Sequence, residues 1–506
     1  MATSKPRRIG LLRAVAAPPA ARPAGARAAA PRGERVARRL LPRLPWFVLL
    51  LVSAALCAVG SLAISTDTWL GIAAGRELLQ HGFSSENTWT RYGSGSWADQ
   101  QWGAHIVFYG VWRVAGAAGL VALHVALLTA GLGLCARTAM RRGGGPVWSA
   151  LLVLVVAIAS VGELVFVRTQ SFSVLCFGLL ACLLGRDDGR LERRVLLALP
   201  LLVIWANLHA AVLVAAGVCA LYAVSSVWEA PARSRGLVAR AALLGLGGCA
   251  ACLATPFALE LPAYMRQTVA NADFRRFISE WQPVTLGNSP IFVALALVAV
   301  ACTARAPIPR RDMLLVWALT FAGFTAIRSE LWAGLAWLVV LPGALERLRP
   351  LAGGRRVRTA AGALAVLAPA CLVLAVAHDV ASGPTAFATT WPPAAAGAVR
   401  EQLVRDPALR VFADEPFADW LLVQVPALRG RLALDSRFET FDHEEFAALA
   451  GLRASPLKVS RRIAREQLYV LEPSAGADGP LVRALERQPG VVRLFGNERI
   501  VVLRRT

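Results

Sequence analysis

Asp67 is the first residue of this chain that could carry out chemistry. It lies in the segment Ser65-Thr66-Asp67-Thr68-Trp69, directly after the first long apolar run, from Trp46 to Ile64. A carboxylate at the point where a helix leaves a membrane lies near lipid head groups, where it could accept a proton or hold a divalent cation. The other interpretation is structural, because the same carboxylate could cap a helix that begins at Thr68.

Further ionisable and amide side chains lie at the ends of later apolar runs. An ionisable group costs roughly 2.5 to 3.5 kcal/mol in the middle of a membrane span, so those that are retained near span ends call for an explanation. The arginines could be interface anchors or members of ion pairs, and His209 could form a buried hydrogen-bonded pair with Asn207. The functional candidates for phosphate or substrate binding are Arg168, Gln170, Asn207, His209, Glu280, Trp281, Arg328 and Glu330.

Together these residue types suit a displacement at a sugar carbon that carries a phosphate leaving group. The carboxylate would deprotonate the acceptor hydroxyl or hold a cation, and guanidinium groups would stabilise the departing phosphate. Arginine suits the second role because its planar fork binds two phosphate oxygens. The sequence contains neither the spacing of a Ser-His-Asp triad nor a tetrahedral zinc motif.

The elements that must position these groups are membrane helices. The chain has 506 residues, of which 56% are hydrophobic and 17% are charged, and a mean hydropathy of +0.53, which excludes an ordinary soluble protein. Runs of roughly 17 to 25 apolar residues can span a bilayer. We predict about eleven spans, near residues 46–64, 116–136, 147–166, 170–185, 195–207, 209–228, 240–258, 290–304, 312–327, 331–345 and 359–378.

The arginines predict the topology. The net charge of +22 is spread over many short loops, which does not favour a nucleic-acid partner. Every second loop is basic, beginning with Arg137, Arg141 and Arg142 after the second run, and the positive-inside rule makes these loops cytoplasmic. The N-terminus is then cytoplasmic, and the C-terminal part is on the outer side. The same outer side collects Asp67, Glu86, Asp99, His105, Glu163, Arg168, Asn207, His209, Glu280, Arg328 and Glu330.

Composition divides the chain into three parts. Residues 1–43 are rich in Arg, Ala and Pro and predict a disordered cytoplasmic tail. Residues 44–380 form the transmembrane domain, with a long outer loop at 65–115 that begins with a surface helix ending at Gly82. Residues 385–506 predict a small α/β domain on the outer side, with strands at 409–413, 431–434, 467–471, 491–496 and 499–504 and helices at 394–405, 416–424, 442–452, 459–465 and 479–488.

Several short motifs resemble the GT-C class of polytopic membrane glycosyltransferases, and more closely a group of uncharacterised bacterial GT-C-like membrane proteins. The first are the span followed at once by Thr66-Asp67-Thr68-Trp69, a helix ending in Leu78-Leu79-Gln80-His81-Gly82, and an aromatic loop with Trp97 and Gln101-Trp102. The others are Arg168-Thr169-Gln170, Trp205-Ala206-Asn207-Leu208-His209, Thr255-Pro256-Phe257, Glu280-Trp281 and Asp435-Ser436-Arg437.

The resemblance implies an outward-facing site, a donor sugar linked to a polyprenyl phosphate, and Asp67 as the main catalytic acid. The sequence lacks the paired acidic motif of better-known members at Thr66-Asp67, and Glu86 would supply the second carboxylate. Asp67 and Glu86 would then be the ligands of a divalent cation, Mg²⁺ or Mn²⁺.

The leading hypothesis is therefore a glycosyltransferase in the inner membrane of a bacterium, in contact with membrane lipids and with a glycan, lipid or protein acceptor. One alternative is a transporter or lipid flippase, which would need polar groups at mid-span and inverted repeats. The other is a non-catalytic assembly protein whose outer domain binds a partner.

Overall fold

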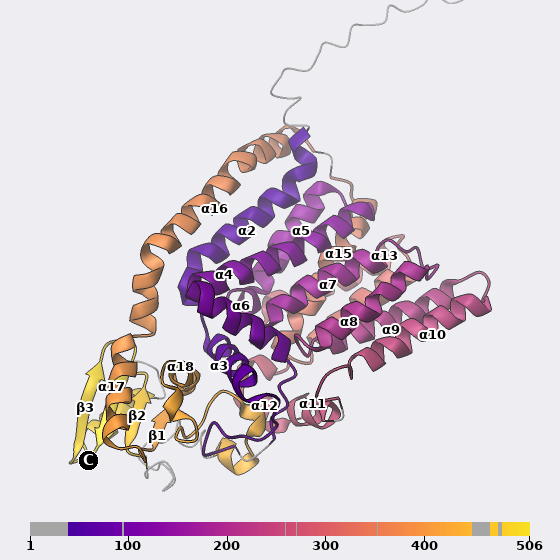
Figure 1. Cartoon of the computed structure of the whole chain (residues 1–506). Coiled ribbons are helices and arrows are strands. Elements are labelled where there is room, and N and C mark those ends of the chain that lie inside the picture. Colours follow the sequence, from indigo (N-terminus) through magenta and orange to yellow (C-terminus); the bar gives the residue numbers. More distant parts are fainter. Residues whose placement is uncertain are drawn as a thin grey trace, which may run out of the picture.

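The structure is a computed structural model that describes residues 39–93, 96–258, 260–269, 271–351, 353–447, 466–473 and 478–506. Most of the predicted tail, the end of the predicted helix 442–452 and the whole of the predicted helix 459–465 lie outside these ranges. Figure 1 shows a helical bundle joined to a small sheet by one long helix. We call the end of the bundle next to this sheet the sheet end.

Each predicted apolar run is helical over most of its length. The helices that cover most of each run are, in chain order, α2 (Leu44–Val59), α4 (Trp102–Arg141), α5 (Pro146–Ala159), α7 (Gln170–Leu184), α8 (Ala198–Ala206), α9 (Val212–Glu229), α10 (Arg235–Ala251), α13 (Pro290–Arg305), α14 (Arg310–Gly323), α15 (Glu330–Leu348) and α16 (Arg355–Thr390). Five helical stretches within the described residues are long and apolar enough to cross a membrane: Leu41–Ala63, Trp102–Arg141, Val212–Glu229, Ile327–Leu348 and Arg355–Arg405. The chain is therefore a helical membrane protein, and the number of eleven spans stays a prediction.

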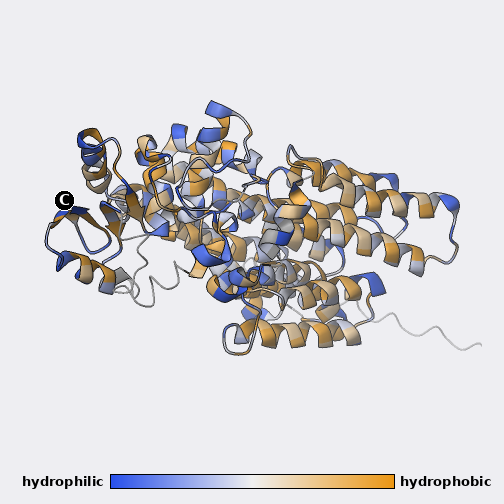
Figure 2. Cartoon of the chain, turned by 90° about the horizontal axis from the view of Figure 1, so that it is seen from below, coloured by the Kyte–Doolittle hydropathy of each residue, from blue (hydrophilic) through white to orange (hydrophobic). Residues whose placement is uncertain are grey.

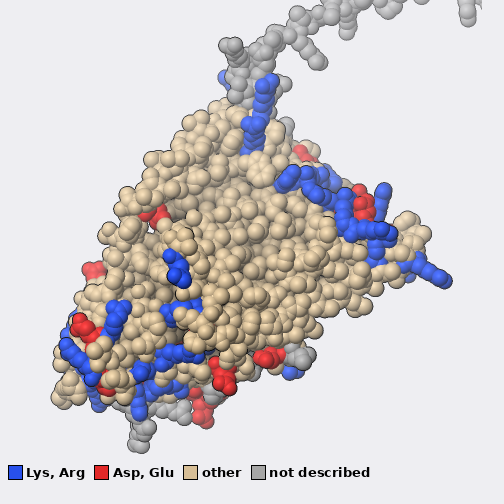
Figure 3. Space-filling view, in the orientation of Figure 1, with Lys and Arg blue, Asp and Glu red and all other residues tan. Residues whose placement is uncertain are grey.

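Charge and hydropathy are segregated as a bilayer requires. Apolar residues dominate the bundle helices, whereas hydrophilic ones concentrate at their ends (Figure 2). On the face shown in Figure 3, charged side chains gather at the sheet end and at the opposite end, with a broad belt almost free of charge between them. Such a belt can face lipid, because hydrocarbon leaves charged groups unsolvated.

Helix α15 forms the centre of the bundle. It packs against α4, α5, α13 and α14, and all of its residues from Glu330 to Ala344 are buried. The indole of Trp337 stacks on Phe292 at 5.2 Å between ring centroids and donates a hydrogen bond of 2.9 Å to Thr320 Oγ1. This contact ties α15 to α13 and α14, and so holds the turn before α15 in place.

The predicted outer loop 65–115 is mostly helical. Helix α3 (Thr66–His81) packs along the first part of α4, and Gly82, with φ of 77°, ends it as predicted. Inside α4, Gly116 leaves helical geometry with φ of 60° and ψ of −150°, at the residue where the second apolar run begins. The part of α4 before Gly116 thus pairs with α3 at the sheet end.

Two helices complete the connection to the sheet. Helix α16 lies along α2 at the edge of the bundle and continues to the sheet end (Figure 1). There Trp391 packs against Trp69 of α3 and Trp420 of α18 (Glu415–Gln424), with centroids 5.3 and 5.9 Å apart. Arg76 of α3 also donates hydrogen bonds to the carbonyls of Leu422 and Val423, at 2.7 and 3.1 Å. The C-terminal domain is thereby docked on α3.

The C-terminal domain contains a four-stranded sheet of order β1-β2-β4-β3. Its strands are β1 (Val411–Ala413), β2 (Leu468–Leu471), β3 (Val491–Gly496) and β4 (Val501–Arg505), of which only β1 and β2 pair in parallel. The helices are α17 (Pro393–Arg405), α18 (Glu415–Gln424) and α20 (Asp478–Glu486). The strand predicted at 431–434 is wrong, because only Leu432 forms isolated bridges, to Thr90 and Val411, before the chain turns.

Candidate functional site

A cavity of about 790 Å³ lies at the sheet end, between the helical bundle and the C-terminal domain. Short segments from seven parts of the chain contribute to its wall. They are the start of α3, the start of α4 with the residues just before it, the turn before α7, the turn between α8 and α9, the segment between α10 and α13, the turn before α15, and the C-terminal domain. The predicted site residues among its lining are Asp67, Arg168, Gln170, His209, Glu280, Trp281 and Arg328.

Asp67 lies in the first turn of α3 and does not cap it. The N-cap is Ser65, whose backbone N–H donates to Thr68 Oγ1 at 3.1 Å. The capping interpretation of Asp67 is therefore wrong, because helix α3 begins one residue before it. Instead, Asp67 Oδ2 forms an ion pair of 2.8 Å with Arg168 Nε.

The turn that carries Arg168 is attached directly to the start of α3. The hydroxyl of Thr68 donates a hydrogen bond of 2.6 Å to the carbonyl of Val167, whose own N–H donates to Ala63 O at 2.9 Å. These two bonds on either side of Asp67 hold the backbone next to Arg168 in register with α3. The pairing of Asp67 with Arg168 is thus enforced by the backbone and not by the side chains alone.

Arg168 is the hub of a group of carboxylates. Besides Asp67, its guanidinium contacts Glu280 Oε2 at 2.9 Å and Glu163 Oε2 at 3.9 Å. Burial alone would lower the pKa of Arg168, but Asp67, Glu280 and Glu163 outweigh it and raise the pKa above its ordinary value. The Arg168 guanidinium is therefore a fixed positive charge that holds three carboxylates around it.

Glu280 connects this hub to a second arginine. Its Oε1 lies 3.7 Å from Arg328, whose guanidinium stacks over the ring of Trp281 at 4.6 Å. The two segments are aligned by the N–H of Ile327, which donates to the carbonyl of Gln282 at 3.0 Å. Burial would raise the pKa of the Glu280 carboxyl, but Arg328 and Arg168 hold it below its ordinary value.

Two histidines line the same cavity. His209 Nδ1 accepts a hydrogen bond of 3.1 Å from the N–H of Ala211, which leaves the proton of the neutral ring on Nε2. His105, at the start of α4, shares a hydrogen bond of 2.9 Å with Asp99 through Nδ1. A carboxylate in this position sets the orientation of the imidazole ring.

Three predicted site residues lie elsewhere. Asn207 accepts a hydrogen bond from Trp102 Nε1 at 2.7 Å and donates to the carbonyls of Val203 and Ala254, so its amide is used in packing. It is not paired with His209. Glu330 is buried at the start of α15, and Glu86 is exposed; neither lines the cavity.

The predicted metal ligands are not brought together. Asp67 is paired with Arg168, and Glu86 lies outside the cavity. No group of three or more His, Cys, Asp and Glu side chains in the described part of the chain is placed to hold a metal ion. The residues around Asp67 therefore do not fit a divalent cation, and metal dependence stays a prediction of the sequence.

The cavity also contains polar residues that the sequence patterns did not single out. They include Gln100 and Tyr264, together with Glu415 and Glu439 of the C-terminal domain. Glu439 follows closely on the Asp435-Ser436-Arg437 motif, which was the one available signal for it. Tyr264 carried no signal, because nothing local distinguishes it from an ordinary loop aromatic residue.

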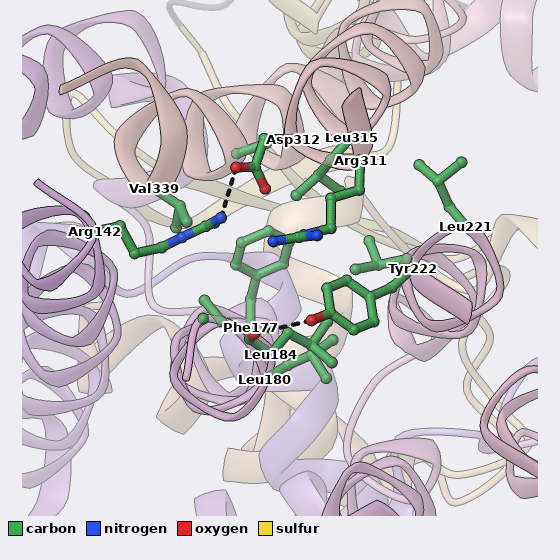
Figure 4. A pocket seen from close by; sticks show the side chains of 14 residues that line it. Arg142, Phe177, Leu180, Leu184, Leu221, Tyr222, Arg311, Asp312, Leu315 and Val339 are labelled. Atoms are coloured by element: carbon green, nitrogen blue, oxygen red, sulfur yellow. Dashed lines mark hydrogen bonds and ion pairs between the residues drawn. The ribbon is translucent and has the colours of Figure 1, made fainter. Parts of the chain in front are cut away.

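A second, smaller cavity of about 40 Å³ lies between α7, α9, α14 and α15 (Figure 4). Its lining includes Arg142, just after α4, and Arg311 and Asp312 at the start of α14, which places it near the opposite end of the bundle. Its arginines are already paired: Arg142 with Asp312 at 2.6 Å and Arg311 with Glu229 at 3.0 Å. The volume is enough for about one water molecule. This gap is therefore explained by packing between paired charges.

No family model matches the chain, and no curated protein matches it. Among solved structures, it is similar to ArnT from Cupriavidus metallidurans bound to undecaprenyl phosphate, with a TM-score of 0.50 and 14% identity over 91% of this chain and 98% of that one. It is also similar to the arabinofuranosyltransferase AftD from Mycobacteria, with a TM-score of 0.51 and 17% identity over 90% of this chain and 41% of that one. At these identities the likeness shows the fold.

Proposed function

We propose that this chain, which has the GT-C fold, is a membrane glycosyltransferase that uses a sugar donor linked to a polyprenyl phosphate. The observation that carries the proposal is the convergence of Asp67, Arg168, Glu280 and Arg328 on one large cavity. ArnT, which has the same fold, binds undecaprenyl phosphate, and AftD is an arabinofuranosyltransferase. A lipid-linked donor agrees with both.

The phosphate of the donor would bind on the arginine side of the cavity. Arg168 is held by carboxylates at 2.8 and 2.9 Å, whereas in the described part of the chain Arg328 has a 3.7 Å contact with Glu280 and a contact with the face of Trp281. Of these two arginines, Arg328 is thus the one that can turn toward a phosphate with the smaller loss of existing contacts. Arg168 would then add its charge from a fixed position.

Asp67 would accept the proton of the acceptor hydroxyl. Its side chain is 46% exposed, and only Oδ2 is engaged by Arg168. In the transfer, the acceptor oxygen bonds to the anomeric carbon of the sugar as the bond from that carbon to the phosphate oxygen breaks. The proton passes to Asp67, and the electron pair of the broken bond stays on the polyprenyl phosphate.

The orientation follows from the charge pattern. The basic loops support a cytoplasmic N-terminus and a cavity on the outer side of a bacterial inner membrane, next to a periplasmic C-terminal domain. A donor anchored in the outer leaflet would then reach the cavity from the lipid. The acceptor would be a glycan, lipid or protein on that side.

Replacing Asp67 by Asn tests the proposal. The chain in nanodiscs would be given labelled undecaprenyl-phosphoryl hexoses, pentoses and amino sugars, with an envelope extract as the source of acceptor. We expect wild-type transfer from at least one donor, and a loss of about 10²- to 10⁴-fold in D67N, because the base is removed.

The matched control is D188N, which changes an exposed aspartate outside the cavity. It should keep wild-type turnover. Wild-type turnover in D67N would contradict the assignment of Asp67. In sealed proteoliposomes, movement of intact donor across the bilayer without transfer would favour a flippase. Altered complex formation alone would favour an assembly protein.

A further inference from the structure

The C-terminal domain places a short segment, residues 436–439, in the wall of the cavity. The segment is anchored by Arg437, which is 1% exposed and forms hydrogen bonds of 2.6 and 2.9 Å to Asp435 Oδ2. Its guanidinium contacts the rings of both Trp89 and Trp97, at 4.1 and 4.9 Å from their centroids. Contacts of this kind with desolvated arginine are strong, so the segment is rigidly positioned.

Within this segment Glu439 has one engaged and one unengaged oxygen. Oε1 accepts hydrogen bonds from Trp97 Nε1 at 2.9 Å and from the hydroxyl of Tyr264 at 3.3 Å. The Tyr264 hydroxyl in turn accepts from Gln100 Nε2 at 3.3 Å. Among the described residues, the side-chain donors that hydrogen-bond to this carboxylate, Trp97 and Tyr264, contact Oε1 and not Oε2. The carboxylate is therefore oriented by protein donors and retains one oxygen for a ligand.

The surroundings of Glu439 fit a sugar ring. Four residues with aromatic rings, Tyr264, Trp281, Phe438 and His105, are among those that line the same cavity. A pocket with apolar walls and a few placed polar groups binds and orients a small ligand. The C–H faces of a sugar can pack on such rings while its hydroxyl groups donate hydrogen bonds to a carboxylate.

We propose that Glu439, oriented by Trp97 and Tyr264, binds hydroxyl groups of the sugar that the donor carries. This inference rests on the proposed function, and it divides the cavity between two chemical groups of one donor. The phosphate lies against Arg328 and Arg168 of the helical bundle, and the sugar lies against the C-terminal domain. Burial raises the pKa of the Glu439 carboxyl, and hydrogen bonds donated by sugar hydroxyls would favour its charged form.

The test compares two probes on the full chain in nanodiscs: undecaprenyl phosphate, which lacks a sugar, and the undecaprenyl-phosphoryl sugar that the wild type transfers best. In E439Q the amide oxygen should keep accepting the hydrogen bonds from Trp97 and Tyr264. The amide NH₂ group, a donor, then faces the cavity where the wild type has an acceptor oxygen. We expect the affinity for the sugar-bearing probe to fall about 10- to 100-fold. The affinity for undecaprenyl phosphate should stay within about twofold.

Two further variants keep the result interpretable. Y264F removes one of the two donors that orient Glu439 and should cause a smaller loss, again only for the sugar-bearing probe. E401Q changes an exposed glutamate of α17 and should bind both probes as the wild type does.

Equal losses of both probes in E439Q would show a structural role and overturn the inference, as would unchanged binding of both. In either case the wild type still binds undecaprenyl phosphate, and the proposed function stands. If the wild type binds neither probe, the proposed function itself fails.

Discussion

At the scale of single residues, the geometry of the cavity depends on the two carboxylates that Arg168 contacts at the same time. Its fork contacts Asp67 and Glu280 from two directions, at 2.8 and 2.9 Å. Lysine has one compact charge and cannot reproduce two divergent contacts. We expect R168K to misplace both carboxylates and to lower turnover on the order of 10²-fold, because displacements of about 1 Å have that effect.

Arg194 provides the control for this change. It pairs with Glu192 at 3.2 Å, and both side chains are about half exposed. The same replacement, R194K, should leave the transfer rate unchanged, since exposed pairs contribute only about 0 to 1 kcal/mol. An R168K variant that transfers sugar at the wild-type rate would show that the bridge between the two carboxylates is not needed.

At the scale of elements, the site depends on the close approach of α3 and α4. A Cβ atom at Gly75 would lie 2.1 Å from the carbonyl oxygen of His105, whereas one at Gly110 would meet open space. We expect G75A to push α3 from α4 and to destabilise the protein by about 1 to 3 kcal/mol. Turnover should fall as well, because Asp67 and His105 lie on these two helices.

The matched variant G110A should be neutral or slightly stabilising, since alanine favours a helix by up to about 1 kcal/mol over glycine. Thermal unfolding and donor turnover, both measured in nanodiscs, check the pair. Equal behaviour of the two variants would mean that the spacing of α3 and α4 does not determine the site.

At the scale of the whole molecule, a buried carboxyl makes the stability of the C-terminal domain depend on pH. Asp419 of α18 is unexposed, and burial together with the nearby Asp435 raises its pKa well above the ordinary value. The folded protein thus keeps a proton that the unfolded chain loses near pH 4. The stabilisation is complete below that pH and is lost as the pH rises through the folded-state pKa.

D419N cannot ionise and should escape this loss. Its unfolding temperature relative to the wild type is expected to increase as the pH rises from about 4 toward neutrality. Differential scanning fluorimetry at several pH values measures the difference, and D188N, at an exposed position, should follow the wild type throughout. A constant offset between D419N and the wild type would contradict a raised pKa.

The sequence by itself determined the helices and the residues worth testing. Runs such as 116–136 appear as helix because length, apolarity and backbone hydrogen bonding are local properties, and even the break at Gly116 coincides with the start of a run. Asp67, Arg168, Glu280 and Arg328 stood out because charge is costly near lipid. The sequence also indicated the GT-C fold through short motifs, which the two solved structures confirm.

Only the tertiary structure decided which of these groups meet. It joined Asp67 to Arg168 and Arg328 to Glu280, left Glu86, Asn207 and Glu330 outside the cavity, and added Glu439 from the far end of the chain. Side-chain convergence depends on the packing of helices and on a docked domain, which involve contacts between residues far apart in sequence. No local pattern encodes such contacts. Candidate residues for the site could therefore be predicted from the sequence, but not which of them lie together.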